Sequence, residues 1–290
     1  MNNPVFQITL FAVLALSACV SIPSEHLTVS QRGNISATQD ANDCDNIQSE
    51  NVRESDAAQI LELDSQGFTL LTWNMLKGMK KGWKEDFKHL AEHQDILTIQ
   101  EARLTDDLRE LLKKGHYNWD ISTAFKYKGV EVGVLTASGP EPDFACTFRI
   151  SEPLIKIPKT ALVTLYPLSE TDKSLMVVNI HSINFTLGTE SFYAQLQKVE
   201  KIMLQHHGPT IFSGDVNTWS ENRIAILKDL ALRLGLKAVT FTKHSRTKVF
   251  GHDVDHVYYR ELTVRDAKVI PVNSSDHYPM VVSFRLEESR

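Results

Sequence analysis

Eight polar residues with the chemistry of a hydrolytic site lie at the ends of apolar segments of the sequence. Each stands at the C-terminal end of a short apolar run or just past that end. Such positions face the crevice at strand ends, where loops converge and functional sites are usually built. The eight residues are Asn74, Glu101, His181, Asp215, Asn217, Asp255, Asp276 and His277.

These residue types predict metal-assisted cleavage of a phosphate ester. Carboxylate and amide oxygens are hard ligands suited to Mg²⁺ or Mn²⁺, which keep several waters and bind through one or two carboxylates plus substrate phosphate. Such an ion polarises the phosphoryl oxygens and offsets charge on the leaving oxygen. His277 would then deprotonate water if a carboxylate fixed its tautomer, and Asp255 is the best candidate for that carboxylate.

Each residue also has an ordinary structural interpretation. Asn74, and Asp215 with Asn217, are typical of turns in which a side chain bonds its own backbone. His181 would suit a buried core position, and Asp255 would cap a turn. The ordered set favours the functional interpretation.

The elements that must position these residues follow a layered α/β pattern. From residue 68 onward, short apolar runs bounded by turn residues alternate with helical periodicity. Strands are expected over 68–73, 96–100, 132–136, 161–166, 175–180, 210–213, 239–242, 254–259 and 280–284, and helices over 84–93, 191–205 and 224–234. We therefore expect one domain over residues 65–290.

Six short motifs occur in order across residues 68–286. They are Trp73-Asn74, Gln100-Glu101, Asn179-Ile180-His181, Ser213-Gly214-Asp215-Val216-Asn217, Asp255-His256-Val257 and Ser275-Asp276-His277. This series resembles the endonuclease/exonuclease/phosphatase superfamily, which has the deoxyribonuclease-I-like fold. The resemblance implies a four-layer α/β sandwich in which two mixed β-sheets pack face to face and are flanked by helices.

The resemblance also implies ligands for metal and phosphate. Asn74 and Glu101 would help hold Mg²⁺ or Mn²⁺, and Asp276 would serve a second metal or phosphate position. Glu101-Ala102-Arg103 resembles the Glu-x-Arg of deoxyribonuclease-I-like members, so Arg103 would approach a substrate phosphate.

The catalytic roles are likewise implied by the resemblance. His181 would contact the scissile phosphate. Asp215 and Asn217 would position the nucleophilic water or assist the leaving group. Asp255 would orient His277, which would act in acid–base catalysis.

The substrate is less closely defined. Net charge is −5 and the sequence pI is about 6.1, so no global basic field draws the protein to nucleic acid. The sequence does contain a local basic cluster, which would either bind a polyanion or be a solvent-exposed helical face with no ligand. Its members are Lys77, Lys80, Lys81, Lys84 and Lys88. The loop over 186–190 lacks the aromatic-rich hairpin expected of membrane-inserting sphingomyelinases. A nuclease-type phosphodiesterase is the leading interpretation; the alternatives are a lipid head-group phosphatase or phospholipase C-like enzyme, and a catalytically inactive surface-anchored binding protein.

The N-terminus predicts export. An apolar run over 8–18 is too short to span a membrane and suits a signal peptide over 1–18, although its first residues carry no Lys or Arg. Leu16-Ser17-Ala18-Cys19 resembles the bacterial lipobox, so Cys19 would be lipidated. A flexible polar tether is expected over 19–64. We expect a monomer in the bacterial cell envelope, bound to a membrane, preferably the outer one, through its N-terminal lipid.

With Cys19 acylated, two thiols remain. Cys44 and Cys146 would be able to pair in an oxidising compartment, but the sequence does not show that they meet. Cys146, between Phe144 and Phe148, is predicted to be a small buried apolar residue.

Overall fold

The fold is taken from a computed structural model of the 290-residue chain. The structure describes residues 20–24, 26–31, 35–38, 44, 61–242 and 245–287. The predicted signal peptide over 1–18 and the predicted lipidation site Cys19 lie outside these residues. Within them, no helix has the length and apolar character needed to cross a membrane.

Two large mixed sheets form the centre of the molecule. The first sheet has nine strands in the order β16-β17-β4-β5-β7-β6-β2-β3, with β1 also pairing with β6. Its strands are β1 Val20–Ser21, β2 His26–Ser30, β3 Ile35–Thr38, β4 Phe68–Asn74, β5 Ile96–Arg103, β6 Asn118–Tyr127, β7 Val130–Ser138, β16 Leu262–Val269 and β17 Met280–Leu286. Only β4 and β5 pair in parallel.

The second sheet has six strands in the order β12-β15-β11-β10-β9-β8. Its strands are β8 Phe144–Ser151, β9 Pro158–Pro167, β10 Ser174–His181, β11 Thr210–Asp215, β12 Lys237–Ala238 and β15 Asp255–Arg260. Strands β10 and β11 pair in parallel. A separate short hairpin is formed by β13 Lys248–Val249 and β14 His252–Asp253.

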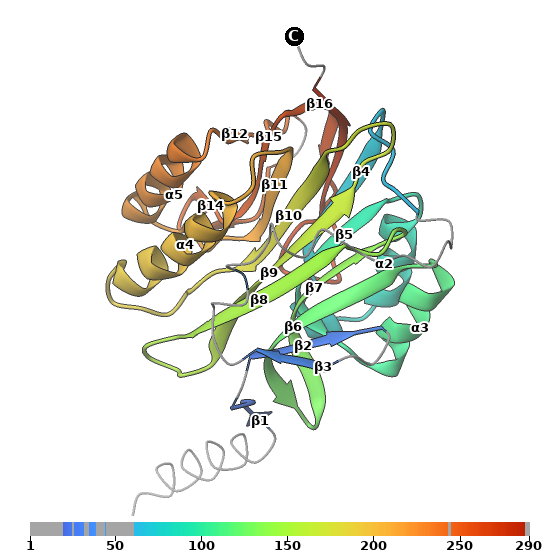
Figure 1. Cartoon of the computed structure of the whole chain (residues 1–290). Coiled ribbons are helices and arrows are strands. Elements are labelled where there is room, and N and C mark those ends of the chain that lie inside the picture. Colours follow the sequence, from blue (N-terminus) through green and yellow to red (C-terminus); the bar gives the residue numbers. More distant parts are fainter. Residues whose placement is uncertain are drawn as a thin grey trace, which may run out of the picture.

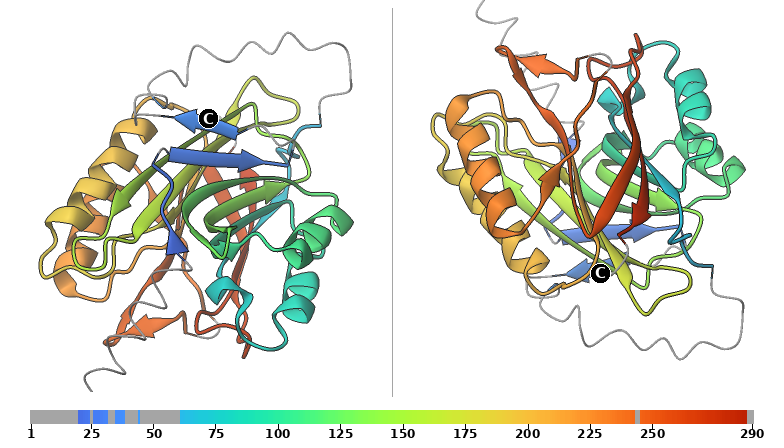
Figure 2. Two further views of the ribbon diagram at one scale, coloured as in Figure 1. Left: turned by 90° about the horizontal axis from the view of Figure 1, so that it is seen from below. Right: turned by 90° about the horizontal axis from the view of Figure 1, so that it is seen from above.

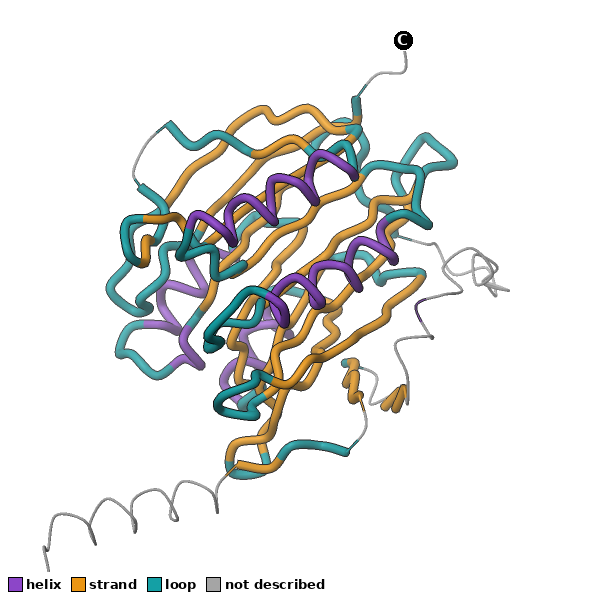
Figure 3. The backbone as a smooth tube through the Cα atoms, turned by 90° about the vertical axis from the view of Figure 1, so that its left-hand side faces the viewer, coloured by secondary structure: helices purple, strands orange, loops and turns teal. Residues whose placement is uncertain are grey.

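Helices cover the outer face of each sheet. Helices α2 (Trp83–Ala91) and α3 (Asp106–Lys114) lie on the first sheet, and α4 (Glu190–Met203) and α5 (Glu221–Arg233) lie on the second (Figure 1). Figure 2 shows the four layers along the sheets, and Figure 3 shows α4 and α5 side by side over the second sheet. The predicted four-layer α/β sandwich is confirmed.

The cores follow these layers. One apolar cluster lies between α4, α5 and the second sheet, another lies between α2, α3 and the first sheet, and a third includes residues from both sheets, such as Phe68, Val177 and Phe284. Because successive side chains of a strand point to opposite faces, each inner strand contributes alternately to a helix-side core and to the gap between the sheets.

Two predictions from the sequence need correction. The strand expected over 239–242 is wrong: the pairing segment is β12, Lys237–Ala238, which runs beside the end of β15. The polar segment over 19–64 is not simply a tether, since β2 and β3 extend the first sheet beyond β6 and Thr28 is buried. Backbone hydrogen bonds to an open sheet edge hold these strands, and a composition rich in Ser and Asn does not reveal such pairing.

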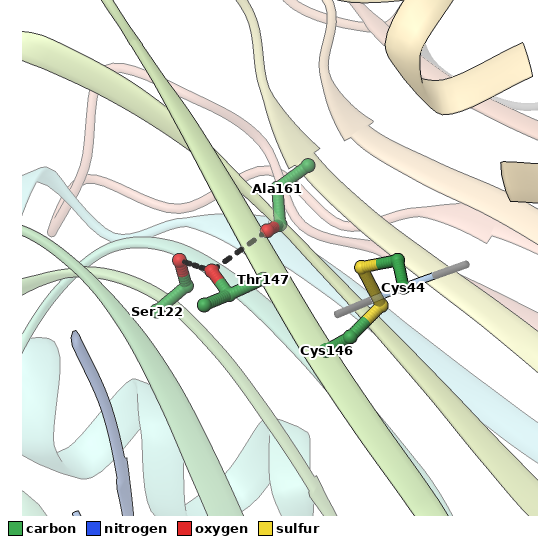
Figure 4. Close-up of a disulfide and its surroundings, with 5 residues drawn as sticks. All are labelled: Cys44, Ser122, Cys146, Thr147 and Ala161. Atoms are coloured by element: carbon green, nitrogen blue, oxygen red, sulfur yellow. Dashed lines mark hydrogen bonds between the residues drawn. A yellow bond between two sulfur atoms is a disulfide. The ribbon is translucent and has the colours of Figure 1, made fainter. Parts of the chain in front are cut away.

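A disulfide bond joins Cys44 to Cys146 on β8, with their Cα atoms 5.6 Å apart (Figure 4). Cys146 is buried as predicted, but as half of a cross-link. The two residues are 102 positions apart in sequence, which is why the sequence left their pairing open.

Candidate active site

The site residues meet because of strand alternation at one end of the sandwich. The inner face of each central strand carries polar side chains toward this end: Thr72 and Asn74 on β4, Thr98 and Gln100 on β5, Asn179 and His181 on β10, Ser213 and Asp215 on β11. Register then places Asp215 opposite both His181 and Asp255. Period-2 spacing therefore directs the motif residues into the gap between the two sheets.

A buried amide pair joins the two sheets beneath the site. Gln100 donates from Nε2 to Asn179 Oδ1 at 2.8 Å, and Asn179 donates from Nδ2 to the carbonyl of Leu135 at 2.9 Å. Both side chains are fully buried. Because buried polar groups are costly when unpaired, this network fixes the spacing of the sheets that carry Glu101 and His181.

Asp215 lies at the centre of the site. Asn74 donates from Nδ2 to Asp215 Oδ2 at 3.0 Å, and His181 Nε2 and His277 Nε2 lie 3.3 Å and 3.9 Å from the same oxygen. Burial raises the pKa of Asp215 to about 6, although His277 and Lys159 favour its ionised form. Burial thus makes the ionised form of this carboxylate costly, so a further positive charge beside it would be stabilising.

Asp255 fixes the ring of His277. The distances from His277 Nδ1 to the two carboxylate oxygens of Asp255 are 2.8 and 3.0 Å. The His277 carbonyl accepts a hydrogen bond from Trp73 Nε1 at 3.1 Å, and its backbone N–H donates to Ser275 Oγ at 3.2 Å. The imidazole Nε2 is therefore directed at Asp215, as an acid–base residue requires.

His277 carries a proton in the metal-free protein. Burial lowers its pKa, but Asp255 and Asp215 together raise it to about 10. An imidazolium in this place suits donation of a proton or hydrogen bond toward an ester oxygen. Acting as a base toward water first requires loss of that proton.

Lys159, which no motif in the sequence marked, contacts His181. Its Nζ donates to His181 Nε2 at 2.6 Å and lies 3.9 Å from Glu152 Oε1. Burial lowers the pKa of His181 well below its usual value, and Lys159 lowers it further, so His181 is neutral. Glu152 is fully buried, and its Oε2 has no hydrogen-bond partner among the described residues. Lys159 lies near the start of β9, and no motif in the sequence around it indicates its contact with His181.

Strained backbone accompanies two of the predicted residues. Glu101 has φ +50° at a bulge where β5 slips against β7, and Asn217 has φ +55°. Left-handed φ is unfavourable for residues other than glycine and clusters at functional sites. Glu101 forms an ion pair with Lys77, while Asn217 donates from Nδ2 to the carbonyl of Ser182 at 3.1 Å and from its backbone to Asp215 Oδ1 at 3.2 Å.

Two predicted residues lie at the margin. Asp276 is exposed and accepts a hydrogen bond from Ser275 Oγ at 3.4 Å. Arg103 packs its guanidinium on the ring of Tyr127, 5.0 Å from the ring centroid. Asp276 acts on the Asp215 cluster through its charge, which helps to raise the pKa of His277, whereas no hydrogen bond or ion pair of Arg103 with that cluster is seen among the described residues.

A pocket opens beside these residues. It has a volume of about 180 Å³. Its polar end is formed by Lys77, Glu101, Lys159 and His181, and its walls include Phe125, Val132, Ile155, Ile157 and Phe185.

The donor set fits a divalent metal ion. Ligand atoms of Asp215, Asp255 and His277 lie within 4.8 Å of one another, and because Asp255 already holds His277, Asp215 is the member of this group that would accept a cation. Asn74 ends β4, and Glu101 follows Gln100, the partner of Asn74 on the parallel strand β5, so further oxygen donors are nearby. A hard cation would stabilise the ionised form of Asp215, which burial disfavours. Lys77 already neutralises Glu101, so metal binding at that carboxylate would displace its ammonium group.

Comparison with known proteins agrees with this geometry. The sequence model of the Endonuclease/Exonuclease/phosphatase family matches residues 71–277. The chain belongs to this family. Members of the endonuclease/exonuclease/phosphatase family are hydrolases that act on phosphoesters and typically use divalent metals.

Relatives and solved structures extend the match. The chain is 39% identical to the UPF0294 protein of Vibrio campbellii over 231 residues, which is 79% of this chain and 81% of that protein, and 37% identical to one from Photorhabdus laumondii over 74% and 82%. Its fold is similar to the human Nocturnin catalytic domain with bound sulfate anion (TM-score 0.60, 18% identity, 78% of this chain and 96% of that one). It is also similar to ANGEL2, a 2′,3′-cyclic phosphatase (TM-score 0.59, 12% identity, 79% and 98%).

Proposed function

We propose that this protein is a divalent-metal-dependent phosphodiesterase that uses an activated water. The observation that supports the proposal best is the buried junction at Asp215, where Asn74, His181 and His277 converge and where Asp255 holds His277 in one orientation. An inactive binding protein has no need of a buried carboxylate whose pKa is raised to about 6 beside a histidine fixed by a second carboxylate.

The residues divide the work as follows. Asn74, Glu101 and Asp215 would hold Mg²⁺ or Mn²⁺, which when bound polarises the phosphoryl oxygens. His181 and Lys159, which contact one another and both line the pocket, would bind the phosphate. His277, oriented by Asp255, would supply the proton that the leaving oxygen takes up.

The lysine cluster favours a compact ester over a long nucleic acid strand. Lys77 lines the pocket, whereas Lys80, Lys81 and Lys84 line a separate hollow over 78–85. Lys88 faces a third hollow between α2 and α3. Among the hollows formed by the described residues, no single one is lined by all five lysines, so we place a lipid or small phosphodiester ahead of the nuclease substrate favoured by the sequence.

Hydrolysis of bis(p-nitrophenyl) phosphate tests the proposed function. We expect turnover with Mg²⁺ or Mn²⁺, loss of turnover with EDTA, and a fall of at least about a hundredfold in His277→Ala. The control is His89→Ala on α2, where the histidine is exposed and outside the site. Turnover that survives EDTA or His277→Ala would contradict the proposal.

We also propose that Cys19 is lipidated and fixes the protein to a membrane of the bacterial envelope, preferably the outer one. Support comes from the lipobox-like Leu16-Ser17-Ala18-Cys19. Mass spectrometry of the mature N-terminus tests it: a diacylated or triacylated Cys19 is expected, and an intact Met1 terminus would contradict it.

A further inference from the structure

The end of the sandwich that carries the site also carries most of the large hydrophobic side chains that are exposed in the described part of the chain. We call this set the apolar rim: Met79, Leu154, Ile155, Phe185, Leu187, Phe250 and Tyr278. Leu187 is 95% exposed and Phe250 is 83% exposed. Apolar side chains gathered at one end mark an interaction surface, whereas scattered ones would need no explanation.

The rim is continuous with the site. Ile155 and Phe185 belong to it and also line the pocket that contains Glu101 and His181. Phe250 packs edge-on against Trp219 with ring centroids 6.1 Å apart. Trp219 in turn donates from Nε1 to Asn184 at 2.9 Å, in the loop that follows His181. Loops of the second sheet thus present apolar groups at and beside the pocket.

The described chain begins at this same end. Val20 pairs with Tyr127 at the tip of the β6–β7 hairpin, and β1 lies there in Figure 1. Arg103, which packs on Tyr127, is two residues beyond Glu101. Val20 directly follows Cys19 in the sequence. A lipid on Cys19 would therefore attach the protein to a membrane at the same end of the sandwich as its active site.

The exposed positive charges at this end and the lining of the pocket both favour binding to a lipid surface. Exposed lysines lie in the loops of this end, at Lys80, Lys81, Lys128 and Lys156, and would attract anionic head groups. In the pocket, apolar walls lead to the amino groups of Lys77 and Lys159. Such a site fits a phosphate ester that is joined to an apolar group.

We propose that the apolar rim docks on a phospholipid membrane and that the substrate is a phospholipid head-group diester taken from that surface. The substrate half rests on the proposed phosphodiesterase function. In the reaction, the oxygen of one water forms a bond to phosphorus, the bond from phosphorus to one ester oxygen breaks, and that oxygen takes a proton. The products are a phosphate monoester and an alcohol, and no oxidant or second substrate is consumed.

The docking half is tested by fluorescence without any need for activity. Leu187→Cys on the rim and Leu232→Cys on the outer face of α5, where the leucine is 79% exposed, are labelled with an environment-sensitive dye in the full chain. Both are reconstituted into phosphatidylglycerol and phosphatidylethanolamine vesicles with brominated acyl chains, and the labelled wild-type chain sets the background. Quenching by the brominated chains at position 187 alone is expected. If the brominated chains fail to quench the dye at position 187 more than the dye at position 232, the proposal that the rim docks on the membrane is wrong.

The substrate half is tested by comparing two esters. We expect vesicle phosphatidylglycerol to be hydrolysed. We expect Leu187→Asp to lower the ratio of its hydrolysis to that of soluble bis(p-nitrophenyl) phosphate about tenfold, because one buried leucine is lost from the contact. The matched Leu232→Asp should leave the ratio unchanged. Cleavage of DNA or RNA without cleavage of lipid would overturn the lipid substrate, whereas failure to cleave even the soluble diester would overturn the proposed function and leave the docking result standing.

Discussion

Replacing Asp255 by Asn tests whether this carboxylate holds the proton on His277. The substitution keeps the shape of the side chain but removes its charge. In the wild-type protein, Asp255 and Asp215 outweigh burial and raise the pKa of His277 from 6.5 to about 10. Because Asp255 makes the direct contact, at 2.8 Å, we expect the pKa of His277 in Asp255→Asn to fall from about 10 toward its ordinary value of 6.5.

The magnitude follows from the size of the shift. A change from 6.5 to about 10 corresponds to roughly 5 kcal/mol, because one pKa unit is worth about 1.4 kcal/mol. The side chain of His277 is only 14% exposed, so solvent screens this interaction little. The folded-state pKa is the higher one, so the stabilisation is complete below about pH 6.5 and is lost as the pH rises through 10.

Two measurements check the prediction in metal-free protein. Histidine side-chain NMR should follow the His277 ring to a pKa near 10 in the wild type, with the signal assigned by its absence in His277→Gln. Urea unfolding at pH 6 and pH 10 should then show that the wild type loses more stability than Asp255→Asn across this interval. A wild-type His277 that titrates near 6.5, or parallel stability losses in both proteins, would refute the reasoning.

Three further predictions concern other parts of the structure. Reduction of the Cys44–Cys146 disulfide, which closes a loop of 102 residues in sequence separation, should lower the free energy of unfolding by about 4 to 5 kcal/mol, measured by urea denaturation with and without reductant. Gly214→Ala should destabilise the fold by more than about 2 kcal/mol in the same assay. The reason is that Gly214 has φ +139° and an added Cβ would lie 2.1 Å from the carbonyl oxygen of Ile180. An unchanged midpoint of urea unfolding would contradict this. Lys159→Met should raise KM for bis(p-nitrophenyl) phosphate by about tenfold or more in steady-state kinetics, since a charge-assisted contact to phosphate is lost, and a fall in kcat alone would argue against a phosphate-binding role.

Much of the layered fold was predictable from the sequence because its signals are local. Apolar runs of period 2 or 3.6 predict helices α2, α4 and α5 and the strands β4, β5, β7, β9, β10, β11, β15 and β17, whereas β6, β8 and β16 were not expected. Helix α3 was missed because its nine residues are mostly charged and only Leu108 and Leu112 are buried. Strands β2 and β3 were missed because β2 is held by pairing with β6, about 90 residues later, and β3 by pairing with β2, and not by their own composition.

The sequence by itself determined the residue types that converge on Asp215, since their position at strand ends follows from alternation and order along the chain. Tertiary structure alone decided which groups surround them. Lys159 against His181, Lys77 against Glu101 and the Cys44–Cys146 bond each join residues more than 20 positions apart. Such contacts depend on the register of paired strands and on the packing of two sheets, and a pattern along one chain does not encode them locally.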